Sequence, residues 1–327
     1  MNFGVIGTAN IARYAVVPAI RDTEHEVLAV GSRDEDRARE FADDLGIDRA
    51  YGSYADLLAD GDLDAVYNPL PNSLHAEYTR AAADRNLHVL CEKPLAVDAA
   101  EAREMGEHCA DRGVTLMEAF MYRFHPRTER VAELVAETFE DVRSVDATFQ
   151  FPLRGRPDDV RLQPELAGGS LMDVGCYAVD AARLLLGEPD RVYGTTADTR
   201  DCGVDTGVTA VLEYDDGRTA TVSASFDTAD VQRYRLEAEN GWLTADEVFV
   251  PRGEEGVAIE YELDGRHVTE SFDSTDQYRL EVEHFADCVR EGTAPRTDAD
   301  EAVRNMRVID AIYESAERGE PVPVGGG

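Results

Sequence analysis

The 327-residue chain is long enough for two domains, and its 43% hydrophobic content is sufficient for a full core. The net charge of -35 argues against nucleic acid and anionic membrane surfaces as partners. No apolar run approaches the length of a membrane span and no signal peptide precedes the first strand, so we expect a cytoplasmic protein.

The charged residues are distributed in an unusual way. Acidic residues are scattered along the chain, and Lys93 is the only lysine among 32 basic residues. This pattern is typical of a protein from a salt-saturated cytosol, where the Debye length falls below roughly 3 Å and self-repulsion is screened. We therefore predict a halophilic protein; a specific basic partner would instead require one dense acidic patch. Five scattered cysteines without a C-x-x-C pair indicate a reducing compartment and no zinc site.

The chain begins with a strand, a glycine turn and a helix. Residues 2–6 are an apolar strand, and a helical pattern follows the turn to about residue 21. In dinucleotide-binding proteins the N-terminus of such a helix faces the pyrophosphate. The second and third glycines of the usual fingerprint are alanines here. We expect the cofactor to contact the turn formed by Gly7, Thr8, Ala9, Asn10 and Ile11.

The second strand, residues 27–31, ends in Ser32-Arg33. An NAD site usually has an acid near this point to hold the ribose 2′-hydroxyl, whereas a hydroxyl and a guanidinium suit a 2′-phosphate. We therefore predict NADP rather than NAD, although Asp34 follows at once and counts against this prediction. In the alternative reading, Arg33 caps the next helix or pairs with Glu35.

Strands and helices continue to alternate. Further strands are expected at residues 63–68, 87–91 and 114–119, which makes five parallel strands in a doubly wound sheet. The turn Pro69-Leu70-Pro71-Asn72 leads into a helix that carries His75. His75 either contacts the cofactor or packs at the start of its helix.

The strand at residues 87–91 leads directly into Glu92-Lys93-Pro94. The carboxyl end of a parallel strand is where open α/β sheets place their ligands. Lysine is a compact point charge whose pKa shifts when it is buried, so it can take part in proton transfer. We interpret Lys93 as a site residue rather than as a surface lysine retained by chance.

After residue 141 the pattern becomes that of a mostly antiparallel sheet. Strands are predicted at residues 142–151, 191–197, 206–214, 218–226, 234–238, 241–250, 257–263 and 267–272. Helices at 277–291 and 298–318 are expected to return to the first domain, and residues 325–327 to be disordered. We predict a Rossmann domain at 1–122 and an α+β domain for substrate binding and oligomerisation at 123–327.

A second informative segment follows the double glycine Gly168-Gly169. A helix from about Ser170 would place Asp173 and Tyr177 four residues apart on one face. The alternative is a buried helix with one satisfied acid and one packed tyrosine.

Together these segments resemble the Gfo/Idh/MocA family of nicotinamide-dependent oxidoreductases over nearly the whole chain. The resemblance is carried by Glu92-Lys93-Pro94, by residues 168–177 and by the turn at residues 69–75. The family's catalytic lysine is Lys93 here, and its catalytic aspartate is Asp173. Tyr177 stands where many members have histidine. This resembles the branch of glucose–fructose oxidoreductase and NADP-dependent D-xylose 1-dehydrogenase.

The resemblance implies an α/β fold and an NADP-dependent oxidoreductase that transfers a hydride between the C1 hydroxyl of an aldose, of the D-xylose or D-glucose class, and nicotinamide. It also implies a homodimer or homotetramer formed through the open sheet. The alternatives are an inositol or dihydrodiol dehydrogenase, an anhydrofructose-type carbonyl reductase and a non-catalytic NADP-binding sensor. Besides the first turn and Ser32-Arg33, the implied cofactor contacts are Leu70, Pro71, Asn72, His75, Glu92, Lys93, Arg123 and Arg161.

The proton of the substrate hydroxyl needs an acceptor. A free tyrosine, with a pKa of about 10, is a poor base at neutral pH. A cationic Lys93 beside Tyr177 would lower that pKa by stabilising the phenolate. We therefore assign Tyr177 as the acid/base, Lys93 as its electrostatic partner and Asp173 as the residue that orients the substrate or Lys93. The reverse assignment, with Lys93 as the direct base, stays open.

Overall fold

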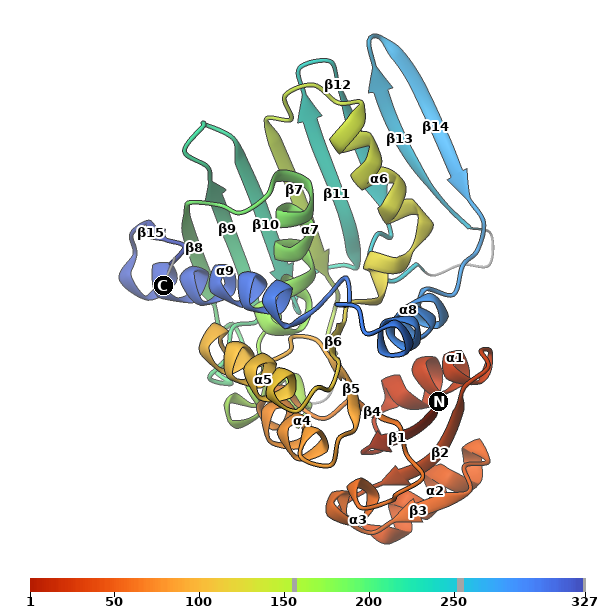
Figure 1. Ribbon diagram of the computed structural model, residues 1–327. Helices are drawn as coiled ribbons and strands as arrows, with labels where there is room; N and C mark the ends of the chain where they lie inside the picture. Colours follow the sequence, from red (N-terminus) through yellow and green to blue (C-terminus); the bar gives the residue numbers. More distant parts are fainter. Residues whose placement is uncertain (155–157, 252–255, 326–327) are drawn as a thin grey trace. The chain divides into compact units, whose positions relative to one another are not determined.

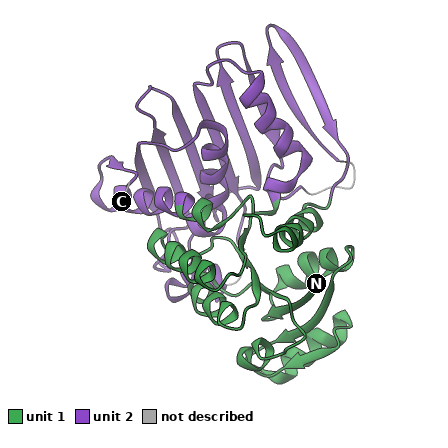
Figure 2. Cartoon of the chain, viewed as in Figure 1, with its two compact units in different colours: residues 1–121, 276–303 green, residues 122–275, 304–327 purple. Residues whose placement is uncertain are grey.

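The computed structural model describes residues 1–154, 158–251 and 256–325. The chain forms two compact units, coloured separately in Figure 2. Unit 1 comprises residues 1–121 and 276–303, and unit 2 comprises residues 122–275 and 304–327. Within the described residues, no helix combines the length and the apolar composition that crossing a membrane requires.

In its described part, unit 1 contains a six-stranded parallel sheet with the order β3-β2-β1-β4-β5-β6 (Figure 1). The strands are β1 (Asn2–Ile6), β2 (Glu26–Gly31), β3 (Arg49–Tyr51), β4 (Ala65–Asn68), β5 (His88–Glu92) and β6 (Leu116–Ala119). The order reverses between β1 and β4, and nucleotides bind at this switch point in such sheets. The predicted doubly wound parallel sheet is confirmed.

The predicted count of five strands is wrong, because β3 was missed. This strand has only three residues, all half-buried, and its sequence Arg-Ala-Tyr carries no apolar alternation. It forms because its backbone pairs with the end of β2, from Ala29 to Gly31. That pairing is set by the sheet and not by local sequence.

The helices of unit 1 carry their own start signals. Asp34 accepts backbone N–H groups at the start of α2, and Asp98 does the same for α5. The helices are α1 (Val17–Arg21), α2 (Glu35–Leu45), α3 (Tyr54–Leu58), α4 (His75–Ala83), α5 (Ala99–Asp111) and α8 (Gln277–Glu291). A π-helical turn, Ala12–Val16, precedes α1, and a 3₁₀ turn, Asn72–Leu74, precedes α4.

In its described part, unit 2 contains a nine-stranded sheet with the order β14-β13-β12-β11-β7-β10-β9-β8-β15. Its pairs are antiparallel except for β7 with β10, so the expected mostly antiparallel sheet is confirmed. The strands are β7 (Ser144–Gln150), β8 (Arg191–Ala197), β9 (Gly207–Glu213), β10 (Thr219–Ser225), β11 (Val231–Ala238), β12 (Gly241–Asp246), β13 (Val257–Leu263), β14 (Arg266–Phe272) and β15 (Val322–Pro323).

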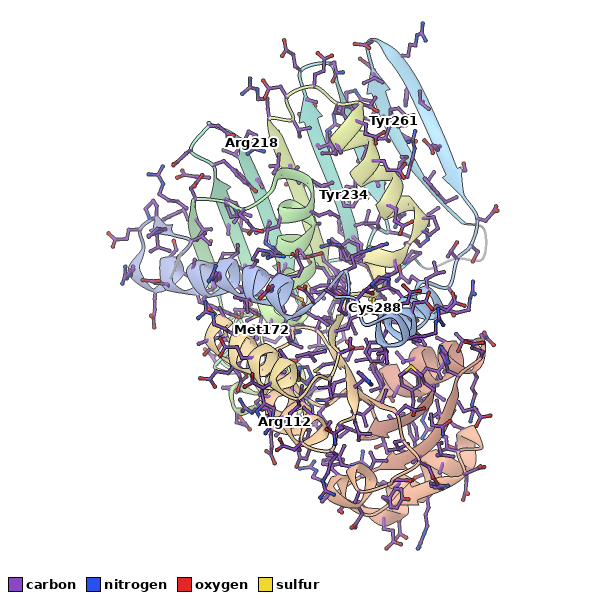
Figure 3. All side chains as sticks on the ribbon, viewed as in Figure 1. Arg112, Met172, Arg218, Tyr234, Tyr261 and Cys288 are labelled. Carbon is purple, nitrogen blue, oxygen red and sulfur yellow. The ribbon has the colours of Figure 1, made fainter. Side chains whose placement is uncertain are left out.

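One face of this sheet is covered by α6 (Pro126–Glu137), α7 (Cys176–Leu186) and α9 (Ala299–Arg318), as Figure 1 shows. Strand residues alternate between the two faces. Tyr234 of β11 and Tyr261 of β13, labelled in Figure 3, are buried. Thr219 and Thr221 of β10 point to the opposite face and are more exposed.

The remaining helical segments are single turns. They are the 3₁₀ turns Met121–Phe124, Val160–Leu162 and Pro164–Leu166, and the π-helical turn Leu171–Gly175 that leads into α7. Helix α8 belongs to unit 1, whereas α9 clusters with unit 2 from residue 304 onward. This differs from the expectation that both helices return to the first domain. The reason is local packing, because Ile312 of α9 lies against Gly194 of β8. Of the segment expected to be disordered, residues 326–327 lie outside the described residues.

Candidate active site

The first turn has the conformation that a dinucleotide-binding site needs. Gly7 has a φ of 104°, which favours glycine, and a Cβ there would lie 3.1 Å from the Leu70 side chain. The Arg13 N–H donates to the Ala9 carbonyl (3.1 Å), so helical bonding starts directly after the turn. The backbone N–H groups at this helix start suit a phosphate anion.

Arg33 lies just after the end of β2, next to two acidic residues that already have partners. Asp34 is engaged as the cap of α2, accepting from the Asp36 and Arg37 N–H groups, and Glu35 pairs with Arg39. The alternative partner of Arg33 is therefore already paired. The charge of Arg33 instead acts on the Tyr54 hydroxyl, where it opposes the rise in the pKa of Tyr54 that burial causes.

Arg37 is a second guanidinium at this corner, and the sequence analysis missed it. Its side chain donates to the Thr8 hydroxyl (3.3 Å) in the first turn. No local spacing marked it, because Arg33 precedes the cap of α2 whereas Arg37 lies within the helix. Two guanidinium groups suit a 2′-phosphate, because guanidinium binds phosphate with charge-assisted hydrogen bonds.

Removing these charges should change cofactor preference. Arg33→Ala and Arg37→Ala are each expected to raise the KM for NADP about tenfold or more, because hydrogen bonds to charged groups contribute roughly 1.5–3 kcal/mol. The KM for NAD should change little. Steady-state kinetics with both cofactors check this, with Arg39→Ala on the same helix as the matched control. Equal KM changes for both cofactors would contradict a 2′-phosphate role.

His75 connects two loops at the carboxyl ends of β4 and β5. Its ring is buried, with Nδ1 2.9 Å from the Pro94 carbonyl oxygen and Nε2 2.7 Å from the Leu70 carbonyl oxygen. Burial lowers the pKa of His75. A neutral imidazole donates to only one of these two carbonyl oxygens, and the buried ring contacts both the turn before α4 and the turn that contains Lys93. A cofactor contact from His75 stays a prediction.

Two carboxylates hold the backbone around Lys93. The Glu92 carboxylate accepts the Tyr67 hydroxyl (2.5 Å) and the Lys93 backbone N–H (3.4 Å). The buried Glu118 accepts the Leu95 N–H (2.7 Å). The peptide bond between Lys93 and Pro94 is cis. Glu118 was not predicted, because its partner lies 23 residues away and only the pairing of β5 with β6 brings them together.

In unit 2, the double glycine allows two backbone segments to approach closely. A Cβ at Gly168 would lie 2.4 Å from the Arg161 carbonyl oxygen, and the Gly169 N–H donates to the same oxygen (2.9 Å). The buried Asp205 fixes the following residues by accepting from the Ser170 hydroxyl (2.6 Å) and the Leu171 N–H (2.8 Å). Asp205 was missed because nothing in the local sequence links it to this segment.

Substitution of Gly169 should destabilise unit 2. Its φ is 122°, and a Cβ would lie 2.3 Å from Asp205 Oδ1. Gly169→Ala is expected to cost about 1–3 kcal/mol from backbone strain alone, with steric displacement of Asp205 in addition. Thermal denaturation checks this, with Gly187→Ala as control, because Gly187 also has a positive φ but no atom near its Cβ position. Equal losses would contradict the steric part of the argument.

Asp173 lies in the π-helical turn and pairs with Arg161. The Arg161 Nε donates to Asp173 Oδ2 (2.9 Å), and Asp159 accepts from the same guanidinium (3.2 Å). The charge of Asp173 raises the pKa of Arg161. The structure thus brings together two residues that the sequence analysis named separately. π-helical turns often occur at functional sites.

Tyr177 lies in the first turn of α7 and packs in an aromatic cluster. Its ring centroid is 5.4 Å from Phe149, 5.4 Å from Phe249 and 5.8 Å from Tyr122. The ring is buried, so its orientation is fixed by packing. Such packing holds a phenol hydroxyl in one position.

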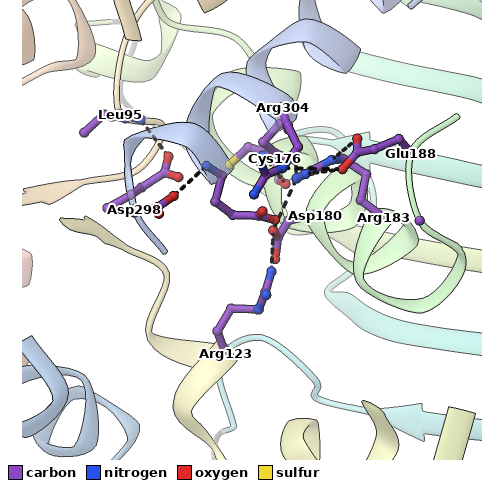
Figure 4. A network of polar contacts seen from close by, with 12 residues as sticks. Leu95, Arg123, Cys176, Asp180, Arg183, Glu188, Asp298 and Arg304 are labelled. Carbon is purple, nitrogen blue, oxygen red and sulfur yellow. Dashed lines mark hydrogen bonds and ion pairs between the residues drawn. The ribbon is translucent and has the colours of Figure 1, made fainter. Parts of the chain in front are cut away.

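Arg123 belongs to a buried ion-pair network (Figure 4). Its side chain is 11% exposed and donates to Asp180 Oδ1 (2.9 Å). The Tyr122 hydroxyl also donates to Asp180. In the same network, Arg183 pairs with Glu188 (2.7 Å). Asp180 was not predicted, and it fixes Arg123 and Tyr122. The predicted cofactor contact of Arg123 stays a prediction.

Residues 1–120 match the model of an oxidoreductase family with an NAD-binding Rossmann fold, and residues 128–244 match the Gfo/Idh/MocA C-terminal domain. The chain is 59% identical to D-xylose 1-dehydrogenase (NADP(+)) 2 of Haloferax volcanii, over 98% of this chain and 99% of the relative.

Two solved structures are similar over nearly their full lengths. One is a 3-ketoreductase from Actinomadura kijaniata in complex with NADP and TDP-benzene, with a TM-score of 0.91 and 33% identity over 96% of this chain and 97% of that chain. The other is the aldose-aldose oxidoreductase of Caulobacter crescentus complexed with glycerol, with a TM-score of 0.90 and 29% identity over 99% of both chains. With both family models matched and a relative of this identity, the chain belongs to the Gfo/Idh/MocA family of oxidoreductases.

Proposed function

We propose that the protein is an NADP-dependent dehydrogenase that oxidises the C1 hydroxyl of an aldose, D-xylose or a sugar of the D-glucose class. The observation that carries this proposal is the 59% identity over 98% of the chain to an NADP-dependent D-xylose 1-dehydrogenase. The family's lysine and aspartate, Lys93 and Asp173, are both present, together with Tyr177. Retention of these residues favours an enzyme over a sensor.

The residues of unit 1 fit NADP. The Gly7 turn and the helix after it offer backbone N–H groups to the pyrophosphate, and Arg33 with Arg37 offers two cations to the 2′-phosphate. The carbonyl-bound His75 keeps the turn at Leu70 in place beside Gly7. In a chain this acidic, two arginines at one strand end favour a phosphate ligand.

When bound, oxidised NADP supplies the nicotinamide that accepts the hydride from C1. The chain's own task is to remove the proton of the C1 hydroxyl. The Tyr177 hydroxyl oxygen accepts that proton as phenolate, and the Lys93 ammonium stabilises the phenolate by its charge. Lys93 lies in unit 1 and Tyr177 in unit 2, so this joint action is part of the proposal. The direct transfer of the proton to the Lys93 amine is the alternative.

Asp173 acts with Arg161 in the proposed scheme. Its carboxylate is held by the Arg161 Nε (2.9 Å), so its direction is set before a sugar hydroxyl approaches. A pre-oriented acceptor costs less conformational entropy when the substrate binds. Asp173 is therefore assigned to orienting the substrate rather than to proton transfer.

The proposal extends to assembly and environment. Unit 2 has an open sheet face with polar residues such as Thr219 and Thr221, and we propose that it forms a homodimer or homotetramer through this face. The scattered acid charge and the relative from Haloferax volcanii, a halophile, support adaptation to high salt. In this proposal, unit 1 binds the cofactor and unit 2 binds the substrate. A cytoplasmic location stays a prediction.

The proposal is tested by the absorbance of reduced nicotinamide in molar salt. NADP or NAD is offered with D-xylose, D-glucose, L-arabinose, inositol and an aromatic dihydrodiol. We expect reduction of NADP with an aldose. Preference for inositol or for the dihydrodiol would replace the sugar assignment. NADP binding without turnover on any of these substrates would favour a carbonyl reductase or a sensor.

A further inference from the structure

Glu281 is a buried carboxyl group in unit 1 that the proposed chemistry does not use. It lies on α8 and is 1% exposed. Its helix packs on the parallel sheet, since Phe285, one turn later, lies 6.0 Å from Phe3 of β1 between ring centroids. Glu281 Oε1 is fully buried and accepts no hydrogen bond from the described residues.

An ionised carboxylate in this position would be costly. A buried charge needs a counter-charge or donors on its oxygens, and without them it is neutralised instead. The titratable groups that act on Glu281 are Glu92 from β5 and Asp276 before α8, both acidic. The hydroxyls of Tyr67 and Tyr278 are in turn affected by the charge of Glu281. Burial, followed by the charge of Glu92, raises the pKa of Glu281 well above its usual range.

Glu92 is supplied with the donors that Glu281 lacks. The Tyr67 hydroxyl and the Lys93 backbone N–H both donate to its carboxylate. Burial and the charge of Glu92 raise the pKa of Tyr67, so Tyr67 stays a protonated donor. Two neighbouring carboxyl groups share a site best when one is neutral. In this pair, Glu92 keeps the charge and Glu281 keeps the proton.

We propose that Glu281 is a positioning residue that stays protonated at neutral pH, so that it adds no negative charge to the strand end next to Lys93, where Glu92 and Glu118 already hold the backbone. The catalytic meaning of this inference rests on the proposed role of Lys93. Ionisation of Glu281 would place a further negative charge near the same strand end, and this charge would hold the Lys93 proton more tightly. Protonated Glu281 therefore limits how strongly the site holds the Lys93 proton.

The first test is the pH dependence of stability. A carboxyl group whose folded-state pKa is raised stabilises the fold below its unfolded pKa of about 4.3, and that contribution is lost as the pH rises towards the folded pKa. The melting temperature of Glu281→Gln minus that of the wild type should therefore increase from acidic to neutral pH. Glu283→Gln is the matched control, because Glu283 is partly exposed on the same helix and pairs with Arg279. A flat difference for Glu281→Gln would overturn the proposal.

The second test reads Lys93 directly and needs no substrate. Lys93 is the only lysine, so isotope-labelled lysine gives one side-chain signal in an NMR titration of the full chain. In the wild type we expect the Lys93 side-chain signal to show a second titration step at alkaline pH, caused by ionisation of Glu281. Glu281→Gln should lack this step. The infrared band of a protonated carboxyl group should be present at neutral pH in the wild type and in Glu283→Gln, and reduced in Glu281→Gln.

The outcomes separate this inference from the proposed function. The absence of the protonated-carboxyl band from the wild type at neutral pH would mean that Glu281 is ionised there, and the absence of a second step would mean that Glu281 does not act on Lys93; either result overturns the inference. The pH-dependent difference in melting temperature, the second titration step and the infrared band can all be observed while no sugar is oxidised. In that case Glu281 does act on Lys93 and only the proposed substrate is wrong.

Discussion

Lys93→Met should lower kcat by about 10²–10⁴-fold, the usual contribution of a positioned acid–base group. Methionine has a similar length and no charge, so the variant removes the ammonium group and leaves the strand end filled. Lys93 follows β5, and its neighbours Glu92 and Leu95 are held by Tyr67 and Glu118, so the backbone should keep its position. The measurement is kcat at saturating NADP and aldose, which separates turnover from binding.

Lys93→Arg distinguishes the two roles of the lysine. Arginine keeps the positive charge but does not lose its proton in proteins. Partial recovery of kcat relative to Lys93→Met would support an electrostatic role with Tyr177 as the base. Equal loss in both variants would support direct proton transfer to Lys93. A Lys93→Met protein with wild-type kcat would refute both schemes.

Tyr177→Phe is expected to lower kcat by about 10²–10⁴-fold for the same reason. The change removes only the hydroxyl, and the ring can keep its contacts with Phe149 and Phe249. The melting temperature should therefore change little. Tyr193→Phe serves as the matched control, because Tyr193 is exposed on β8 of the same unit. Near-wild-type turnover of Tyr177→Phe would transfer the base role to Lys93.

The double variant tests whether both residues act on one proton. If they do, the loss in Lys93→Met/Tyr177→Phe should be close to that of the more damaging single variant, because groups that act as a unit are strongly non-additive. Multiplied losses would mean independent roles. This comparison matters because the two residues belong to different units of the chain.

The order and type of most elements followed from local sequence. Apolar runs bounded by turn residues predicted β1, β8, β13 and α8 with the observed bounds, since periodicity directly reflects which side chains a strand or helix buries. The position of Lys93 at a strand end followed in the same way. The short β3 did not, because three half-buried residues give no periodic signal.

The sequence by itself determined the two sheets and the place of Lys93 at a strand end, because apolar periods act over a few residues, whereas Asp173 and Tyr177 were named as catalytic through the resemblance to the family. Only the tertiary structure decided their partners. Arg161 reaches Asp173, and the charge of Glu92 acts on Glu281, through packing between segments that are distant in sequence. Such contacts depend on how whole elements are placed, and no local pattern encodes that placement. The proton on Glu281 is likewise a property of its buried environment and not of its residue type.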